Sequence, residues 1–263
     1  MALEHCQLCR GTGWKMVPRP DGAGRVAVPC DCGMEDRAAR VLERARVPKR
    51  YEHCDFESYS TDVGTTPSET RSLKEAKVYT QGFVRDYPGG SDKGLLLMGP
   101  SGVGKTHLAV AALKELIRRG HQGLFCDYRE LLKEIQASYN PASQSTEMAI
   151  LEPVRTAEVL VLDDLGASKP SDWVRDIVGI VLNARYNEKR TTIITTNYID
   201  NPATDGEPAR LPSGKLVPPT REDSLEQRIG SRMRSRLFEM CRTVEVLAPD
   251  FRRERTQAGR ARA

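Results

Sequence analysis

With 263 residues, of which 39% are hydrophobic and 29% charged, the chain is long enough for one large domain or two modest ones. No apolar run approaches the roughly 18 residues of a membrane span, and the first residues lack the pattern of a secretory signal, so we expect a cytoplasmic protein without membrane association or structural disulfides. The formal net charge of +4 lies wholly in residues 251–263, where five arginines stand against one acid, so nucleic acid could contact the neutral remainder only through local patches.

Four of the seven cysteines lie near the N-terminus as two close pairs, spaced C-x2-C and C-x-C. These residues are Cys6, Cys9, Cys30 and Cys32. Turn residues and a candidate short strand separate the pairs, and the segment is too small for a core of its own. The pattern therefore favours a Zn²⁺ ion held by four thiolates. His5 could replace one ligand, and free cysteines or a redox pair are the alternatives.

A charged helix over residues 34–46 is expected to follow, so we assign residues 1–46 to a cysteine-rich module with its helix. After the helix, Tyr51 and Phe56 are expected to anchor the chain to the main domain. We expect Cys54 to be a buried small side chain and not a ligand.

Residues 47–70 are interpreted as a lead-in or linker, because residues 60–70 are polar and rich in turn residues. A helix is expected over residues 71–87 from its apolar spacing. We assign residues 71–250 to the main domain and residues 251–263 to a basic, disordered tail.

The most specific motif is GPSGVGKT at residues 99–106, which follows an apolar run and precedes a helical pattern. Its glycines allow successive backbone N–H groups to point at phosphate oxygens, at the positive end of the helix. Lys105 would reach the β- and γ-phosphates, and the Thr106 hydroxyl would lie on Mg²⁺. A glycine-rich turn that matches by chance is the alternative, but the flanking elements favour a nucleotide-binding loop. The expected nucleotide contacts are Gly99, Pro100, Ser101, Gly102, Val103, Gly104, Lys105, Thr106 and His107.

Apolar strand patterns then alternate with helical patterns. The strands are expected at residues 123–127, 158–166 and 191–197. This alternation predicts an α/β fold in which a parallel sheet lies between layers of helices. Ligands of such sheets bind at the carboxyl ends of the strands, where Asp163 and Asn197 are expected.

Asp163 and Asp164 end the pattern VLVLDD. Together with a phosphate loop, this pair suggests that Asp163 holds Mg²⁺ through water and that Asp164 polarises the water that attacks the γ-phosphate. Acids that merely end a buried strand are the alternative. Asn197 could orient the attacking water or sense the γ-phosphate, and a strand-end cap is the alternative there.

The Pro- and Gly-rich stretch between residues 197 and 225 is expected to be an exposed loop or an extended hairpin. SLEQRIGSRMRSRLFEM should then form a helix with an apolar face and Arg228, Arg232 and Arg236 beside it. A nucleotidase with no spare cation for the γ-phosphate needs an arginine finger, often from a neighbouring subunit. An arginine of this helix is the best candidate, and a solvated helix is the alternative.

In this order and spacing, the motifs GPSGVGKTHLA, VLVLDDLG, TTIITTN and SLEQRIGSRMRSRLFEMC resemble the AAA+ ATPases of the DnaC/DnaI type. These are bacterial replicative helicase loaders, grouped with the IstB-type transposition helper ATPases. The resemblance covers about residues 45–253. It implies an AAA+ core with Walker A at residues 99–106, Walker B at Asp163 and Asp164, and sensor 1 at Asn197.

The same resemblance implies an arginine finger at Arg236, with Arg232 as the second choice. The closing PDFRR is similar to a terminal arginine motif of the family, which would make Arg252 a sensor 2 residue. Some relatives also carry a cysteine-rich N-terminal module.

The function that the resemblance implies is the ATP-dependent loading of the replicative DNA helicase, with hydrolysis as a release switch. The cysteine module would hold the helicase, and an ATP-dependent homo-oligomer would bind single-stranded DNA. In this family, helices downstream of Walker A bind the DNA, so the resemblance implies four candidate contacts through stacking and charge, with ordinary surface residues as the alternative: Tyr128, Arg129, Lys133 and Tyr139. The alternative functions are an IstB-type helper of a transposase on duplex DNA, a small-molecule kinase, and an adaptor that binds ATP without hydrolysing it.

Overall fold

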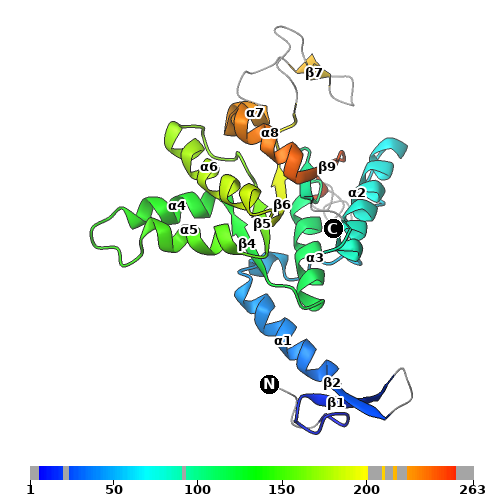
Figure 1. Cartoon of the computed structure of the whole chain (residues 1–263). Helices are drawn as coiled ribbons and strands as arrows, with labels where there is room; N and C mark the ends of the chain where they lie inside the picture. Colours follow the sequence, from blue (N-terminus) through cyan, green and yellow to red (C-terminus); the bar gives the residue numbers. More distant parts are fainter. Residues whose placement is uncertain are drawn as a thin grey trace, which may run out of the picture.

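The centre of the protein is a parallel sheet with helices on both sides (Figure 1). The computed structural model describes residues 6–19, 24–90, 93–200, 209–210, 216–217 and 224–252. Within this part of the chain, five strands pair in parallel in the order β4-β5-β6-β3-β9. Their bounds are Gly94–Met98 for β3, Gly123–Asp127 for β4, Val159–Asp163 for β5, Thr191–Thr196 for β6 and Cys241–Glu245 for β9. The expected α/β fold is confirmed.

Both faces of the sheet are covered, which explains why β3 and β5 are buried along their whole length. Side chains alternate between the faces, so Leu95 and Leu97 join one core and Leu96 and Met98 join the other. The helices on the first side are α1 (Asp31–Arg44), α2 (Pro67–Asp86) and α3 (Lys105–Arg118). Those on the second side are α4 (Tyr128–Ser138), α5 (Glu147–Thr156), α6 (Asp172–Asn187), α7 (Leu225–Ile229) and α8 (Ser231–Met240).

The strand order places the ends of β3, β5 and β6 next to one another. Strand β6 lies between the other two, with Ile194 opposite Leu162 and Thr196 opposite Met98. Because parallel strands end at the same edge of a sheet, the segments that follow these three strands meet there. Ligands of open α/β sheets bind at this edge.

The lead-in before α2 packs on the main core and is not a detached linker. Tyr51, Cys54, Phe56 and Tyr59 are all buried in the core that contains α3. The anchoring predicted for the two aromatic residues Tyr51 and Phe56, and the burial predicted for Cys54, are confirmed. Helix α2 begins at Pro67, four residues before the predicted start, because Thr66 and Glu69 form a capping box there.

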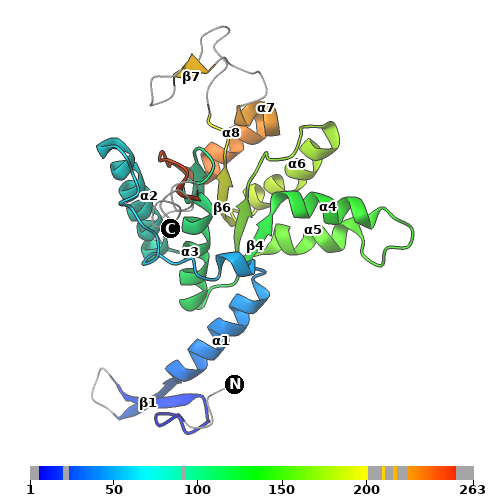
Figure 2. The same cartoon turned by 180° about the vertical axis from the view of Figure 1, so that it is seen from behind.

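The N-terminal module stands away from the sheet, at the far end of α1 (Figures 1 and 2). Its strands β1 (Trp14–Pro18) and β2 (Arg25–Pro29) form an antiparallel ribbon. Strand β2 was predicted from the sequence RVAVP, and β1 was not predicted. Helix α1 begins before the predicted residue 34 and ends where the Ala45 carbonyl accepts a hydrogen bond from the Phe125 N–H at 2.7 Å.

The arginine-rich helix of the sequence analysis is two helices. Gly230 lies between α7 and α8 with a φ of +84°, a backbone conformation that ends a helix and suits glycine. The single helix predicted across this stretch is therefore wrong, and Arg228 stands on a different helix from Arg232 and Arg236. The apolar residues predicted to share one face do pack together in the second core: Leu225, Ile229, Met233, Leu237 and Met240. Upstream, β7 (Ala209–Arg210) and β8 (Leu216–Val217) pair in antiparallel fashion, as expected of a hairpin, and the rest of residues 201–223 lies outside the described part of the chain.

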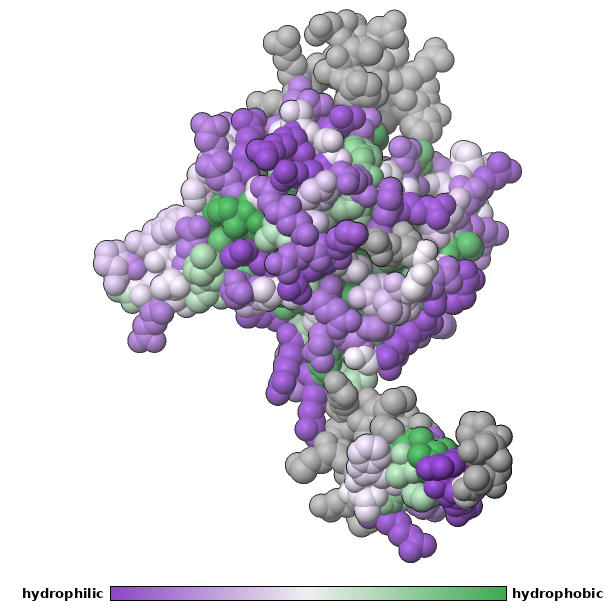
Figure 3. Space-filling model, viewed as in Figure 1, coloured by the Kyte–Doolittle hydropathy of each residue, from purple (hydrophilic) through white to green (hydrophobic). Residues whose placement is uncertain are grey.

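Among the described residues, no helix has both the length and the apolar character needed to cross a membrane. The face of the molecule in Figure 3 is mainly hydrophilic. Large apolar side chains do reach the surface, for example at Trp14 on β1, Val78 on α2 and Met148 on α5, each on a different element. Scattered exposure of this kind is normal for a folded protein.

Arg185 of α6 is fully buried and ties the second helical layer to the sheet. Its guanidinium donates to Thr192 Oγ1 at 2.9 Å and to the carbonyl oxygens of Thr191 at 2.6 Å, Ala157 at 2.9 Å and Val154 at 3.0 Å. These acceptors belong to the end of α5, the loop after it and strand β6. Burial lowers the pKa of Arg185 to about 9.

We expect Arg185→Met to lower the free energy of unfolding by about 3 kcal/mol, because several buried carbonyls lose their donor at once. Urea denaturation measures the change. Arg190→Met is the matched control, since Arg190 also donates to a carbonyl oxygen, that of Thr156, but is partly exposed. Its loss should cost less than about 1 kcal/mol. Equal losses for the two variants would contradict the role given to Arg185.

Candidate nucleotide-binding site

The loop after β3 approaches the C-terminal segment so closely that two of its glycines have no room for a side chain. A Cβ on Gly99 would lie 2.1 Å from the Val246 carbonyl oxygen, and a Cβ on Gly102 would lie 2.0 Å from Asp250 Oδ1. Both residues also have positive φ angles, of 147° and 84°. These two positions of the loop therefore require glycine, and α3 begins at Lys105, at the end of the loop.

A cavity of about 1000 Å³ opens beside this loop. Its walls come from the loop itself, the ends of β4, β5 and β6, the lead-in, and the C-terminal segment. The contribution of lead-in residues 50–63 to these walls was not predicted, because the sequence indicated packing on the main domain at Tyr51 and Phe56 and gave no sign of a site. The volume is in the range of small-molecule and cofactor sites.

Lys105 is 5% exposed, and the acceptors that its ammonium contacts within the described part of the chain are all neutral. Nζ donates to the carbonyl oxygens of Pro100 at 2.6 Å and Gly99 at 2.8 Å, and to Asn197 Oδ1 at 2.8 Å. Burial lowers the pKa of Lys105 to about 8, although Asp163 and Asp164 act in the opposite direction. A buried cation of this kind fits an anionic ligand such as a phosphate, which would supply the missing counter-charge.

Asp163 is 2% exposed, and its Oδ1 accepts a hydrogen bond from Thr106 Oγ1 at 2.8 Å. Burial raises the pKa of this carboxyl group to about 6. A hydroxyl and a carboxylate at the end of the phosphate loop are oxygen ligands of the type that Mg²⁺ uses beside phosphates. These two side chains fit the magnesium site expected from the sequence.

Asp164 has a φ of +62°, which directs its side chain to the next strand. Its Oδ1 accepts a hydrogen bond from Asn197 Nδ2 at 2.9 Å. Asn197 therefore connects Lys105 to Asp164: its amide oxygen accepts a hydrogen bond from Lys105, and its amide nitrogen donates one to Asp164. The structure brings these three predicted residues into one hydrogen-bonded chain.

Thr195 is a residue of this site that the sequence analysis missed. Its hydroxyl donates to Asp163 Oδ1 at 2.7 Å and accepts from the Asp164 N–H at 2.9 Å. One side chain thus fixes the carboxylate of the first acid and the backbone of the second. The signal was present in TTIITTN, because a polar residue two positions before Asn197 shares its side of the strand.

His107 turns toward the lead-in. Its Nε2 lies 2.8 Å from the Asp55 carbonyl oxygen and 3.2 Å from Ser58 Oγ. Burial lowers the pKa of this imidazole. His107 lines the cavity, but these two contacts hold its ring against the lead-in.

The predicted arginines fall in different places. Arg252, the predicted sensor 2 residue, lines the cavity. The Arg236 guanidinium lies 5.0 Å from the ring centre of Tyr186 on α6, and Arg232 is exposed. Among the described residues that line the cavity, none belongs to α8. Arg236 and Arg232 are thus outside the site of their own chain.

One of the four predicted DNA contacts is wrong. Tyr128 is 2% exposed within the second core, so its ring cannot stack on a base. Arg129 and Lys133 line the cavity, where Arg129 donates to the Ala167 carbonyl oxygen at 2.9 Å. Tyr139 is 53% exposed, and its hydroxyl bonds with Glu147 and Trp173.

The four N-terminal cysteines come together as a cluster. Sγ of Cys6 lies 3.7 Å from Sγ of Cys30, Sγ of Cys9 lies 3.3 Å from Sγ of Cys32, and all four sulfurs are within 4.8 Å of one another. Thiolates around a tetrahedral Zn²⁺ ion are about 3.8 Å apart. The backbone N–H groups of Cys9 and Leu8 lower the pKa of Cys6 to about 6, which favours a thiolate. The cluster fits the expected zinc ion, and His5 lies outside the described residues.

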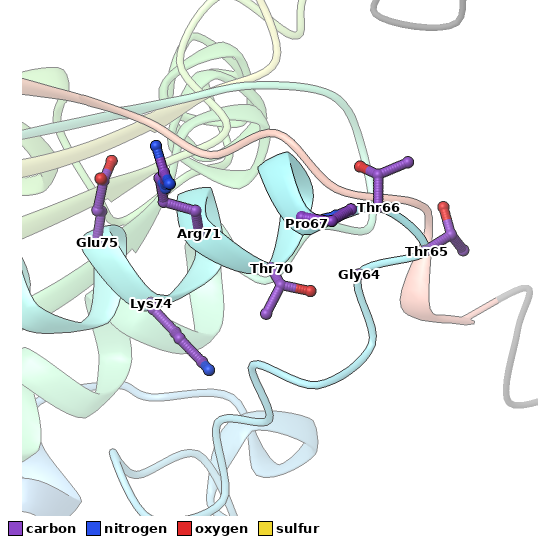
Figure 4. A pocket seen from close by; sticks show the side chains of 8 residues that line it. All are labelled: Gly64, Thr65, Thr66, Pro67, Thr70, Arg71, Lys74 and Glu75. Carbon is purple, nitrogen blue, oxygen red and sulfur yellow. The ribbon is translucent and has the colours of Figure 1, made fainter.

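A second hollow, of about 510 Å³, lies at the beginning of α2 (Figure 4). All the residues around it belong to the segment 64–75, and none is a predicted site residue. It shares no lining residue with the cavity beside the phosphate loop, so we give it no role in the site.

Comparisons with known proteins agree with this geometry. The family of IstB-like ATP binding proteins matches residues 33–200. The replicative helicase loader DnaC of Escherichia coli strain K12 is 25% identical over 158 residues, which are 60% of this chain and 61% of that protein. The replicative helicase loader DnaI of Bacillus subtilis strain 168 is 34% identical over 118 residues, which are 44% of this chain and 37% of that protein.

A crystal structure of the DnaC helicase loader has the same fold. It superposes with a TM-score of 0.58 and 30% identity, over 76% of this chain and the whole of that one. The chain therefore matches the full length of a solved loader structure, but only 61% of the curated DnaC of Escherichia coli.

Thr195→Val should weaken the binding of a fluorescent ATP analogue about tenfold in the presence of Mg²⁺ and leave the Mg²⁺-free affinity unchanged. The variant removes a hydrogen bond to a charged acceptor at Asp163. Thr196→Val is the matched control, because this buried hydroxyl donates instead to the Leu165 carbonyl oxygen at 2.8 Å. Thr195→Ser should restore the affinity. The same losses in both valine variants, with and without Mg²⁺, would show that Thr195 only stabilises the strand.

Proposed function

The chain belongs to the IstB-like ATP-binding proteins of the DnaC loader type, and we propose on this premise that it loads the replicative DNA helicase in an ATP-dependent way. The observation that carries the proposal is the match to every residue of the chain in a crystal structure of the DnaC helicase loader. The nucleotide cavity supports it, because its loop, lysine and acids are those that an ATP-driven loader needs. We place this activity in the cytoplasm.

ATP would bind with its phosphates on the loop of residues 99–106. The Lys105 ammonium would give up its hydrogen bonds to the Gly99 and Pro100 carbonyls and bind the β- and γ-phosphates instead. This movement would also break its hydrogen bond to Asn197. Thr106 and Asp163 would hold Mg²⁺, which neutralises phosphate charge when bound. Asn197 and Asp164 would stay connected and would orient the attacking water, a role that their hydrogen bond supports.

The bond between the γ-phosphorus and the β,γ-bridging oxygen would then break, with ADP as the leaving group and the water oxygen joined to phosphorus. A cation would stabilise the negative charge that develops on the γ-phosphate oxygens. Among the described residues that line this cavity, no arginine of α8 from the same chain is present to supply it. We assign that cation to Arg236 of a neighbouring copy. Hydrolysis would therefore require an ATP-dependent homo-oligomer.

Residues 1–46 would hold the helicase, since the cysteine cluster and its ribbon stand away from the sheet on α1 (Figure 1). A Zn²⁺ ion on the four cysteines would fix this module. Arg129 and Lys133 remain the candidate contacts to single-stranded DNA, because both side chains border the cavity. ATP would favour the assembled, DNA-bound state, and hydrolysis would release the partner.

Capture of the partner tests the loader role. The tagged full chain, incubated with ATP in an extract of its own organism, should retain the replicative helicase, identified by mass spectrometry. Lys105→Ala should lose this capture, because ATP binding fails. Recovery of a transposase without helicase would instead assign the chain to the transposition helpers.

Mixing of inactive variants tests the arginine finger. Arg236→Ala should lower ATP turnover on the order of 10³-fold, and Asp164→Asn should be inactive as well. A mixture of the two should regain activity, because the Arg236→Ala subunit keeps its acids and receives Arg236 from its neighbour. Arg232→Ala is the matched control on the same helix and should turn over normally. Mixtures that stay inactive at every ratio would contradict a finger supplied in trans.

A further inference from the structure

A second cluster of metal-ligating side chains lies at the edge of the nucleotide cavity. His53 and Cys54 belong to the lead-in, and His107 belongs to the first turn of α3. Cys54 Sγ lies 3.9 Å from His53 Nε2, and the ring centres of the two histidines are 6.0 Å apart. One ligand atom from each of the three residues lies within 4.8 Å of the other two.

The hydrogen bonding of His107 resembles that of a metal-binding histidine. Its Nε2 lies 2.8 Å from the Asp55 carbonyl oxygen, which can only accept, so Nε2 is assigned as the protonated nitrogen. Nδ1 is then left with the lone pair. Histidines that ligate metals usually donate their other ring N–H to a carbonyl or carboxylate, which fixes the tautomer and the orientation of the ring.

The three residues have a path to solvent, since all of them line the cavity of about 1000 Å³. Some metal sites have three protein ligands and a fourth position that is open to a cavity, where a water or another small ligand binds the ion. The three residues have this arrangement. None of the three belongs to the hydrogen-bonded chain of Lys105, Asn197 and Asp164. None belongs to the four-cysteine cluster either, so their arrangement is not explained by either site.

We propose that His53, Cys54 and His107 form a second metal site, which binds one Zn²⁺ or similar transition-metal ion and joins the lead-in to α3. Two imidazoles and one thiolate are ligands that select such ions over Mg²⁺, so the magnesium used with ATP would not compete. The Cys54 thiol loses its proton when it binds the ion. This site is independent of the proposed loading of a helicase.

Binding should also stabilise the fold, because the ion connects residues that are far apart in the sequence and binds the folded state only. The lead-in is held on α3 by packing of Tyr51, Phe56 and Tyr59 in the first core. A metal ion at its surface edge would add a direct link between His53, Cys54 and α3. Thermal unfolding of the full chain therefore provides a readout that does not depend on ATP turnover.

Metal titration of the reduced, metal-free full chain tests the site, with Zn²⁺ for stoichiometry and Co²⁺ as the optical probe. The wild-type chain should bind two ions, a tight one in the four-cysteine cluster and a weaker one in the new site. Binding of the second ion should raise the melting temperature. Cys54→Ala should abolish the second binding step, and the exposed His53→Gln should weaken it at least tenfold while both variants keep the first step.

Cys126→Ala is the matched control, because Cys126 is a free cysteine on β4 that belongs to neither cluster. It should keep both steps, and Cys9→Ala should lose the first step and keep the second. Equal melting temperatures in chelator for wild type, Cys54→Ala and His53→Gln would show that the variants fold. A wild-type stoichiometry of one ion per chain, or a second Co²⁺ step that survives Cys54→Ala, would overturn the proposal.

Discussion

The buried ammonium group of Lys105 is the constraint on which the site depends. It is desolvated, yet among the residues that the structure describes no carboxylate contacts it, and its protons are accepted by two loop carbonyls and the Asn197 amide. Such a charge is tolerated when its hydrogen bonds are satisfied, and it gains most from an anion that completes the site. The resting hydrogen bonds to Gly99, Pro100 and Asn197 are therefore those that a phosphate can replace. Phosphate binding at Lys105 would break the hydrogen bond from Lys105 to the Asn197 amide oxygen. Because the amide nitrogen of Asn197 also donates to Asp164, the ligand would alter the contacts of a residue that touches the second acid.

The sheet makes this connection between distant parts of the chain possible. Because β6 lies between β3 and β5, the residue after β6 reaches the ends of both neighbours. Asn197 thus contacts Lys105 on one side and Asp164 on the other, and Thr195, on the same strand, contacts both acids. The second acid needs this support, since its φ of +62° is uncommon for a residue with a side chain.

The features that were predicted correctly from the sequence, the phosphate loop and the strands of the sheet, are determined by the local pattern of residues. The phosphate loop has its own glycine spacing, and β3 and β5 have the continuous apolar runs that are typical of strands in a parallel sheet with two covered faces. Tertiary packing decided what was missed: Tyr128 is polar enough to suggest a surface contact, yet its ring is in the second core. Likewise, nothing in the polar lead-in indicates that it walls the cavity. Gly230 was visible in the sequence, but helix interiors tolerate single glycines, so its positive φ could not be foreseen.

The packing of α8 decides how the nucleotide site can be completed. Met233 and Leu237 anchor this helix in the second core, and the helix places Arg236 over Tyr186 of α6. To carry Arg236 into the cavity of its own chain, α8 would have to remove these side chains from the core, at a cost of several kcal/mol. A neighbouring copy can present the same arginine without any such loss. If Arg236 acts in hydrolysis, the fold itself therefore makes hydrolysis a property of an assembly, and a single chain would bind ATP without completing the reaction.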